Sequence, residues 1–269
     1  MPRAKKWVGD LLLHSPAPLR SLRDLPLVGN LIHRLSHRLV PADQLVWARV
    51  EAGPAKGLWL ELNPRTGQAY VRGEAEQAVQ AVIAKRLRPG MVFYDLGANV
   101  GLFTLLAARL VGETGKVFSF EPDPENVARL RRNIERNGFR NVTVVESGIW
   151  SSSGTLRFVA SVAGSPDHGF GKFVENGPER EGALASCVAL DDFARTAPPP
   201  DAIKCDIEGA EIAALRGAAA LLQSPRRPWI ICEMHSPAND RAAREILAGY
   251  GYQLETADEL HVLALPAKE

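Results

Sequence analysis

Two carboxylates, Asp95 and Glu121, stand at the ends of apolar runs, and a glycine-rich turn lies between them. Residues 95–101 read Asp-Leu-Gly-Ala-Asn-Val-Gly, and a helical pattern begins directly afterwards. Small residues in such a turn keep side chains out of the way, so that backbone N–H groups can approach a ligand. The turn residues that we expect to contact a cofactor are Gly97, Ala98, Asn99 and Gly101.

Together the two carboxylates predict a cationic, ribose-bearing ligand, S-adenosylmethionine. Glu121 follows the turn by about twenty residues, and its two oxygens can accept both ribose hydroxyls. Asp95 offers an anion to the positive amino group and sulfonium, and the helix start favours the ligand's carboxylate. Ser147, after a third apolar run, is expected beside the adenine. The predicted activity is therefore methyl transfer.

A nicotinamide dinucleotide is the competing ligand for this turn. Its fingerprint needs a third glycine, which is absent here, and no acid at the strand tip. A carboxylate at Asp95 would repel a pyrophosphate by ~4 kcal/mol per charge pair at ~4 Å and an effective dielectric of ~20. A nicotinamide-dependent oxidoreductase is therefore the less favoured alternative.

A second polar group ends a fourth apolar run, where Lys204, Asp206 and Glu208 alternate and so share one face. Transfer to a hydroxyl needs an acceptor oxygen held in line with the methyl group, and a base accelerates it ~10²–10⁴-fold. We expect Asp206 to contact the acceptor or act as the base, and Lys204 to balance its charge or bind the acceptor. A salt-bridged strand end is the alternative.

Other side chains offer further routes to catalysis. His235 ends a fifth apolar run and titrates near neutral pH, so it is a candidate base, and His168 is a weaker one. A metal-assisted route would need Asp206 with further ligands such as Glu233 or residues 239–240. The sequence contains no clear ligand set, so a metal is not expected to be required.

Alternating strand and helix patterns predict a doubly wound, mostly parallel α/β sheet. Strands are expected at 91–96, 116–120, 142–146, 202–207 and 229–234, with an antiparallel pair at 252–255 and 261–265. Helices are expected at 100–110, 124–137, 208–222 and 240–249. Two further strands, 154–160 and 183–190, enclose a long loop at 161–182 that is either a lid over the acceptor or a surface excursion.

Three segments are predicted: a basic extension at 1–45, a β-hairpin with a helix at 46–88, and the main domain at 89–269. The first forty residues hold seven Lys or Arg against two Asp. We expect a solvated extension there, or a weak peripheral contact with anionic lipid or a carrier.

Composition excludes several classes of protein. A net charge of +1 and 7% aromatic residues, without a basic stripe on the core, argue against nucleic acid as a partner. Three sparse cysteines favour reduced thiols and a cytoplasmic location. Since no apolar run approaches ~20 residues, a transmembrane helix is not expected. The expected partner is a small-molecule or glycan acceptor.

These motifs, in this order, resemble the FkbM family of methyltransferases. The similarity covers about residue 47 to the end, and its most specific part is Lys-x-Asp-x-Glu-Gly-x-Glu at 204–211. Gly73 and Glu76 fit a further Gly-x-aromatic-Glu pattern, but Ala75 stands where the family often has an aromatic residue.

The resemblance implies the class I methyltransferase fold and dependence on S-adenosylmethionine. It also implies O-methylation of a hydroxyl on a sugar, polyketide or other secondary metabolite. A methyltransferase-like binding module that has lost catalysis is the second hypothesis.

Overall fold

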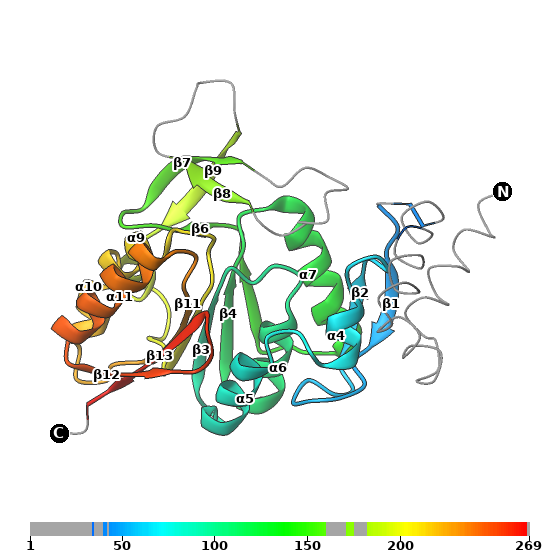
Figure 1. Cartoon of the computed structure of the whole chain (residues 1–269), viewed down its shortest axis with the longest axis horizontal. Helices are drawn as coiled ribbons and strands as arrows, with labels where there is room; N and C mark the ends of the chain where they lie inside the picture. The colour runs from blue at the N-terminus through cyan, green and yellow to red at the C-terminus, as the bar shows by residue number, and fades with distance from the viewer. Residues whose placement is uncertain (1–33, 35–39, 42, 160–170, 175–181, 268–269) are drawn as a thin grey trace. The chain divides into compact units, whose positions relative to one another are not determined.

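The computed structural model describes residues 34, 40–41, 43–159, 171–174 and 182–267 (Figure 1). Almost all of the basic extension lies outside these residues, as do His168 and most of the loop expected as a lid. Among the described residues, no helix has the length and apolarity that crossing a bilayer requires.

The chain divides into two compact units, and the described residues up to Ala75 belong to the first. Its strands β1 (Val46–Arg49) and β2 (Trp59–Leu62) pair antiparallel and confirm the expected hairpin. A short helix, α4 (Gln68–Arg72), follows.

The second unit comprises Glu76–Ala160 with Gly169–Glu269. Helix α5 (Gln77–Arg86) falls in this unit, whereas the sequence-based division grouped it with the hairpin.

A seven-stranded sheet forms the centre of the second unit (Figure 1). Its order is β12 (Tyr252–Thr256), β13 (His261–Pro266), β11 (Trp229–Glu233), β10 (Ala202–Cys205), β3 (Val92–Leu96), β4 (Lys116–Phe120) and β5 (Val142–Val145). The strands from β11 to β5 are parallel, while β13 pairs antiparallel with β11 and with β12. This order and the reversed strand confirm the class I methyltransferase fold.

The remaining helices are α6 (Leu102–Val111), α7 (Pro124–Asn137), α8 (Leu190–Phe193), α9 (Glu211–Arg216), α10 (Ala219–Gln223) and α11 (Pro237–Gly249). The longer helices α6, α7 and α11 match the predicted pattern, whereas the short helices α4 and α8 were not expected. The single helix expected at 208–222 is wrong, because α9 ends at Arg216 and Gly217 follows it. A Cβ on Gly217 would lie 2.3 Å from the Trp150 carbonyl oxygen, so the chain packs too closely there for a side chain.

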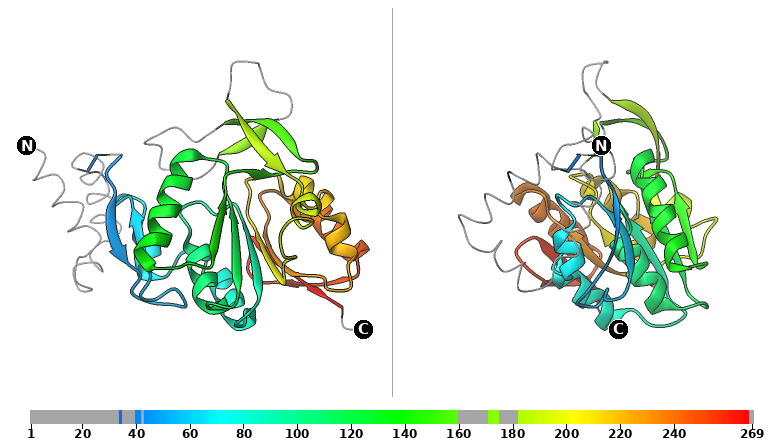
Figure 2. Two further views of the ribbon diagram at one scale, coloured as in Figure 1. Left: turned by 180° about the vertical axis from the view of Figure 1, so that it is seen from behind. Right: turned by 90° about the vertical axis from the view of Figure 1, so that its right-hand side faces the viewer.

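A smaller sheet has the order β6 (Gly148–Ile149), β9 (Ala183–Val188), β7 (Gly154–Val159) and β8 (Lys172–Val174). β7 and β9 were expected, but β6 and β8 are too short to show a pattern in the sequence. Because β6 begins three residues after β5 ends, this sheet lies beyond the carboxyl ends of the large sheet's strands (Figure 2).

The two faces of the large sheet differ in character. On one face Tyr94, Phe118 and Phe120 pack around Phe193 of α8, with ring centroids 4.9–5.6 Å apart. Since side chains alternate along a strand, the intervening residues point to the opposite face, which α6 covers. Polar residues gather on that second face.

Candidate functional site

A row of buried polar side chains crosses three strands beneath α6. Lys204, Asp95 and Ser119 stand side by side in the register of β10, β3 and β4. Thr104 of α6 donates a 2.5 Å hydrogen bond to Asp95 Oδ2, and its oxygen lies 2.9 Å from Ser119 Oγ. Asp95 has no exposed surface, and its Oδ1 has no hydrogen-bond partner among the described residues. Burial raises the pKa of Asp95 to about 6, although Lys204 and Thr104 act the other way.

Backbone donors of the glycine-rich turn are satisfied within the protein. The N–H groups of Gly97 and Ala98 both donate to the Phe120 carbonyl at 3.0 Å, and that of Gly101 donates to Ala98. Asn99 N donates to Glu121 Oε2 at 2.7 Å. This differs from the expectation that these donors face a ligand, because they tie the turn to the end of β4.

Gly97 is required by a close approach of the backbone. Its φ is +75°, and a Cβ there would lie 1.8 Å from the Asp206 carbonyl oxygen. The glycine therefore lets the end of β10 pack directly against the turn after β3.

Gly97→Ala is expected to destabilise the protein more than Gly138→Ala. Both positions have a φ near +70°, which costs an L-residue about 1–2 kcal/mol, but nothing lies within 4 Å of a Cβ on Gly138. The backbone clash at Gly97 should at least double that loss in the free energy of unfolding, measured by urea denaturation. Equal losses in the two variants would contradict the role assigned to Gly97.

Glu121 stands at the carboxyl end of β4 with its side chain 5% exposed. Its Oε2 accepts the Asn99 N–H at 2.7 Å, and its Oε1 accepts the Asp123 N–H at 3.0 Å and the Asn126 Nδ2–H at 3.5 Å. Burial raises the pKa of Glu121 to about 7, while these three hydrogen bonds lower it. Oε2 therefore retains a lone pair for one ribose hydroxyl, and on Oε1 the 3.5 Å contact with Asn126 is long enough for a second hydroxyl to replace it.

Ser147 follows the next strand, β5, and is also buried. Its Oγ donates to the Gly148 carbonyl at 3.3 Å. Asp95, Glu121 and Ser147 thus lie at the ends of three adjacent parallel strands, where open α/β sheets bind ligands.

S-adenosylmethionine fits this edge of the sheet. Glu121 keeps free acceptor capacity at a strand end, and the two carboxylates disfavour a pyrophosphate. Asp95 contributes differently from the expectation, because it is enclosed beneath the turn and supports the turn from below. The fit of S-adenosylmethionine therefore rests on the position and the acceptor oxygens of Glu121.

Lys204 and Asp206 form a fixed ion pair beside the turn. Lys204 Nζ donates to Asp206 Oδ2 and to the Gly97 carbonyl, both at 3.0 Å. Burial would lower the pKa of Lys204, but the carboxylates of Asp206 and Asp95 raise it above its ordinary value. Burial would raise the pKa of Asp206, but Lys204 holds it below its ordinary value. The Asp206 side chain is 21% exposed, so an ionised carboxylate is accessible here.

The contacts of His235 argue against the expected role as a base. Its Nδ1 lies 3.1 Å from Glu211 Oε1, and its Nε2 lies 3.3 Å from Glu208 Oε2. Hydrogen bonds to these two carboxylates raise the pKa of His235 to about 11, so the ring is an imidazolium at neutral pH and has no lone pair for a proton. Its Nε2 also lies 3.6 Å from Asp206 Oδ1, which adds a second cation beside that carboxylate.

Three residues that shape this edge were not identified as site residues from the sequence. Glu211 is fully buried and accepts the backbone N–H groups of Ile207 and Gly209. Glu76 and Glu233 both approach His261 Nε2, at 3.6 and 3.7 Å. The Gly-x-aromatic-Glu pattern could have identified Glu76 from the sequence. His261 could not be identified in this way, because only the pairing of β11 with β13 places it opposite Glu233.

Two hollows lie at opposite edges of the large sheet. One, of about 370 Å³, is beside the carboxyl end of β11 and has His235, Asp240, Arg244, Asp258 and His261 in its lining.

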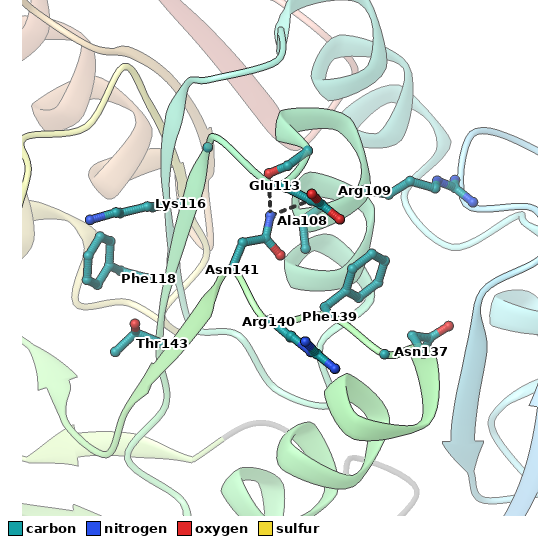
Figure 3. Close-up of a pocket in the computed structure, with 13 residues that line it drawn as sticks. Ala108, Arg109, Glu113, Lys116, Phe118, Asn137, Phe139, Arg140, Asn141 and Thr143 are labelled. Atoms are coloured by element: carbon teal, nitrogen blue, oxygen red, sulfur yellow. Dashed lines mark hydrogen bonds between the residues drawn. The ribbon is translucent and has the colours of Figure 1, made fainter.

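The other hollow, of about 1010 Å³, is at the amino ends of β4 and β5 (Figure 3). Figure 3 shows that its basic side chains, Arg109, Lys116 and Arg140, point in different directions, while Asn141 donates to the Ala108 and Gly112 carbonyls. The first hollow is linked to the Lys204–Asp206 pair through His235, which lines it and lies 3.6 Å from Asp206 Oδ1, whereas the lining of the second hollow includes none of these residues.

Comparison with known proteins gives matches over most of the second unit. The family profile of the methyltransferase FkbM domain matches residues 95–254. The hexuronic acid methyltransferase AglP of Haloferax volcanii is 27% identical over 177 residues, which are 64% of this chain and 68% of that protein. The 31-O-demethyl-FK506 methyltransferase FkbM of Streptomyces tacrolimicus is 39% identical over 90 residues, which are 34% of this chain and 30% of that protein.

Among solved structures, a methyltransferase FkbM from Methylobacillus flagellatus is 18% identical, with a TM-score of 0.46 over 88% of this chain and 59% of that one.

Proposed function

The chain belongs to the methyltransferase FkbM domain family, and from this premise we propose that it methylates a hydroxyl oxygen of a small polar acceptor, such as a sugar or a polyketide. As a member of that family it is an S-adenosylmethionine-dependent methyltransferase. The oxygen acceptor and its chemical class are the proposed part.

One observation carries the proposal: an accessible, ionised carboxylate, Asp206, held beside the cofactor turn by Lys204. Bound S-adenosylmethionine supplies a methyl group activated by its positive sulfur. Asp206 can accept a hydrogen bond from an acceptor hydroxyl and so orient its oxygen. As the acceptor oxygen bonds to the methyl carbon, the sulfur–methyl bond would break and leave a neutral thioether, and the hydroxyl proton becomes acidic enough to pass to Asp206.

Lys204 and His235 act on that carboxylate and not on the acceptor directly. Both are cations within 3.6 Å of its oxygens, and they keep Asp206 ionised across the neutral range. Lys204 also donates to the Gly97 carbonyl, which links the carboxylate's position to that of the turn.

A hydrophilic acceptor is supported by the hollow beside β11. Its lining includes two histidines, two aspartates and Arg244, which can hydrogen-bond to hydroxyl groups. The relative AglP is named as a methyltransferase of a hexuronic acid, and this favours a sugar among the possible acceptors. The free, buried thiols of Cys187, Cys205 and Cys232 are in keeping with the proposed cytoplasmic location.

The alternatives are less well supported. A binding module without catalysis has no need for the ordered contacts of Lys204 with Asp206. A nicotinamide-dependent oxidoreductase would have to place a pyrophosphate beside the buried carboxylates of Asp95 and Glu121.

The test is incubation of the full chain with methyl-labelled S-adenosylmethionine and separate sets of hexuronic acids, neutral sugars and polyketide alcohols. We expect label in one set, and NMR of the product should show an O-methyl group. The matched control is the same mixture with Glu121→Ala, which should not transfer label. Label on a nitrogen or carbon atom would contradict the proposal.

A further inference from the structure

We propose that Glu76, Glu233 and His261 bind a divalent transition-metal ion of the zinc type at the carboxyl end of β11. His261 Nε2 lies 3.6 Å from Glu76 Oε2 and 3.7 Å from Glu233 Oε2. One ligand atom from each of the three side chains lies within 4.8 Å of the other two. All three residues belong to the second unit.

These distances suit a shared ion better than hydrogen bonds. Both exceed the 3.2 Å upper end of ordinary N–H···O bonds, and one ring N–H cannot point at two carboxylates at once. Two ligands each ~2.0–2.2 Å from a tetrahedral ion lie roughly 3.3–3.6 Å apart. The observed separations are close to that range.

Two of the ligand atoms are buried without a partner. His261 is 5% exposed, and among the described residues its Nε2 and Glu76 Oε2 have no hydrogen bond. Buried polar atoms in folded proteins nearly always have a partner, so a pair facing each other across 3.6 Å indicates a missing one. An ion between them would satisfy both.

The imidazole is held in the orientation that a metal ligand needs. Its Nδ1 lies 2.8 Å from the Asp258 carboxylate and donates to Oδ1, so Nε2 is the nitrogen left to face the two glutamates. Burial would lower the pKa of His261, but Glu233, Glu76 and Asp258 raise it to about 10, so a bound ion would take the place of the Nε2 proton. Asp258 is itself fixed, because the same oxygen accepts the Leu260 and His261 N–H groups at 2.9 Å. Metal-bound histidines almost always have such a carboxylate or carbonyl on the other nitrogen. Asp258 is therefore a positioning residue.

The backbone brings the three side chains together from distant parts of the chain. Glu233 and His261 are directly opposed in the β11–β13 pair. Glu76 precedes α5 with a φ of +44°, a conformation that non-glycine residues rarely adopt. Strained residues of this kind persist where the surrounding structure or a ligand holds them.

Local charge also favours a cation. In the part of the chain that the structure describes, the carboxylates that act electrostatically on this cluster or its neighbours are Glu76, Glu233, Asp258, Asp206 and Asp95. Against these five carboxylates stand three cations, Lys204, His235 and, without an ion, the protonated ring of His261. The excess of negative charge is one that a divalent ion offsets.

Ligand type selects the class of ion. Two carboxylates and one imidazole suit zinc, manganese or iron, whereas magnesium and calcium prefer oxygen ligands alone. Three protein ligands leave a fourth position free, and His261 also lines the 370 Å³ hollow. A water or an acceptor oxygen can take that position.

The test is titration of Zn²⁺ into the chelator-treated full chain by calorimetry, which does not depend on methyl transfer. We expect one ion per chain. Glu76→Gln, Glu233→Gln and His261→Ala should each weaken binding at least about 10-fold, and Asp258→Asn should weaken it about 10-fold through the imidazole. Zn²⁺ should also raise the thermal midpoint of the wild type but not of His261→Ala.

Two matched controls locate the ion. Glu245→Gln changes an exposed glutamate of α11, and Glu208→Gln changes the other cluster of potential ligands, formed by Asp206, Glu208 and His235. Both should bind Zn²⁺ as the wild type does, and circular dichroism checks that every variant is folded. No binding by the wild type, or unchanged affinity in any of the three ligand variants, would overturn the proposal. So would loss of binding in Glu208→Gln alone.

Discussion

Glu121→Gln is expected to weaken S-adenosylmethionine binding by about 10- to 100-fold, as measured by calorimetry. Hydrogen bonds to a charged group contribute about 1.5–3 kcal/mol, and the proposed ribose diol would lose its charged acceptor. Glutamine also places an NH₂ group where the carboxylate now accepts the Asn99 and Asp123 N–H groups, so the turn would lose a hydrogen bond as well.

The control for this prediction is Glu146→Gln, one residue past β5. Glu146 is 55% exposed and pairs with Arg131 on the surface, so the same chemical change there should leave cofactor affinity within about twofold. Equal affinity of Glu121→Gln and the wild type would contradict the ribose assignment.

The same carboxylate predicts the direction of a pH effect. Because burial raises the pKa of Glu121 to about 7, the free protein holds a proton there under mildly acidic conditions. A protonated carboxyl accepts hydroxyl hydrogen bonds more weakly, so affinity should rise as pH increases through 7 and then level off. Glu121→Gln should lack this rise. An unchanged pH profile in the variant would assign the titration to another group.

The positions of the large sheet's strands along the sequence were predictable because the parallel strands carry continuous apolar runs. Parallel strands buried on both faces read as such runs, and β4 and α7 begin and end at the predicted residues. Asp123 caps α7 and Gly138 ends it, as its end signals indicate. β6 and β8 have only two and three residues, which leaves too little sequence for a period to appear.

The residue types of the candidate site were also predictable, but their partners were not. Lys204 and Asp206 share a face because they alternate, and the 3.0 Å contact follows from that spacing. The surroundings of His235 depend on a turn in which Glu208 has a φ of +55°, which no local pattern indicates. Likewise, the burial of Asp95 follows from Thr104 on a helix that packs over it.

Asp206→Asn is expected to lower kcat by about 10²–10⁴-fold while cofactor affinity stays within about threefold. Asparagine has the same shape and can still accept from Lys204, but it is neutral and cannot take a proton. Asp206 follows β10 and Glu121 follows β4, and β3 lies between these two strands. The substitution should therefore leave the contacts of Glu121 with the cofactor unchanged. Labelled methyl transfer and calorimetry measure the two quantities.

The surface variant Asp192→Asn is the matched control for that prediction, since Asp192 contacts Ser153 and Arg195 on α8's side of the sheet. It should retain wild-type kcat.

Lys204→Met tests whether Lys204 acts by keeping Asp206 ionised. The pKa of Asp206 should rise once its neighbouring cation is gone, so the pH profile of kcat should shift to higher pH. A wild-type kcat in Asp206→Asn, joined to a large loss in Glu233→Gln, would move the base from β10 to β11.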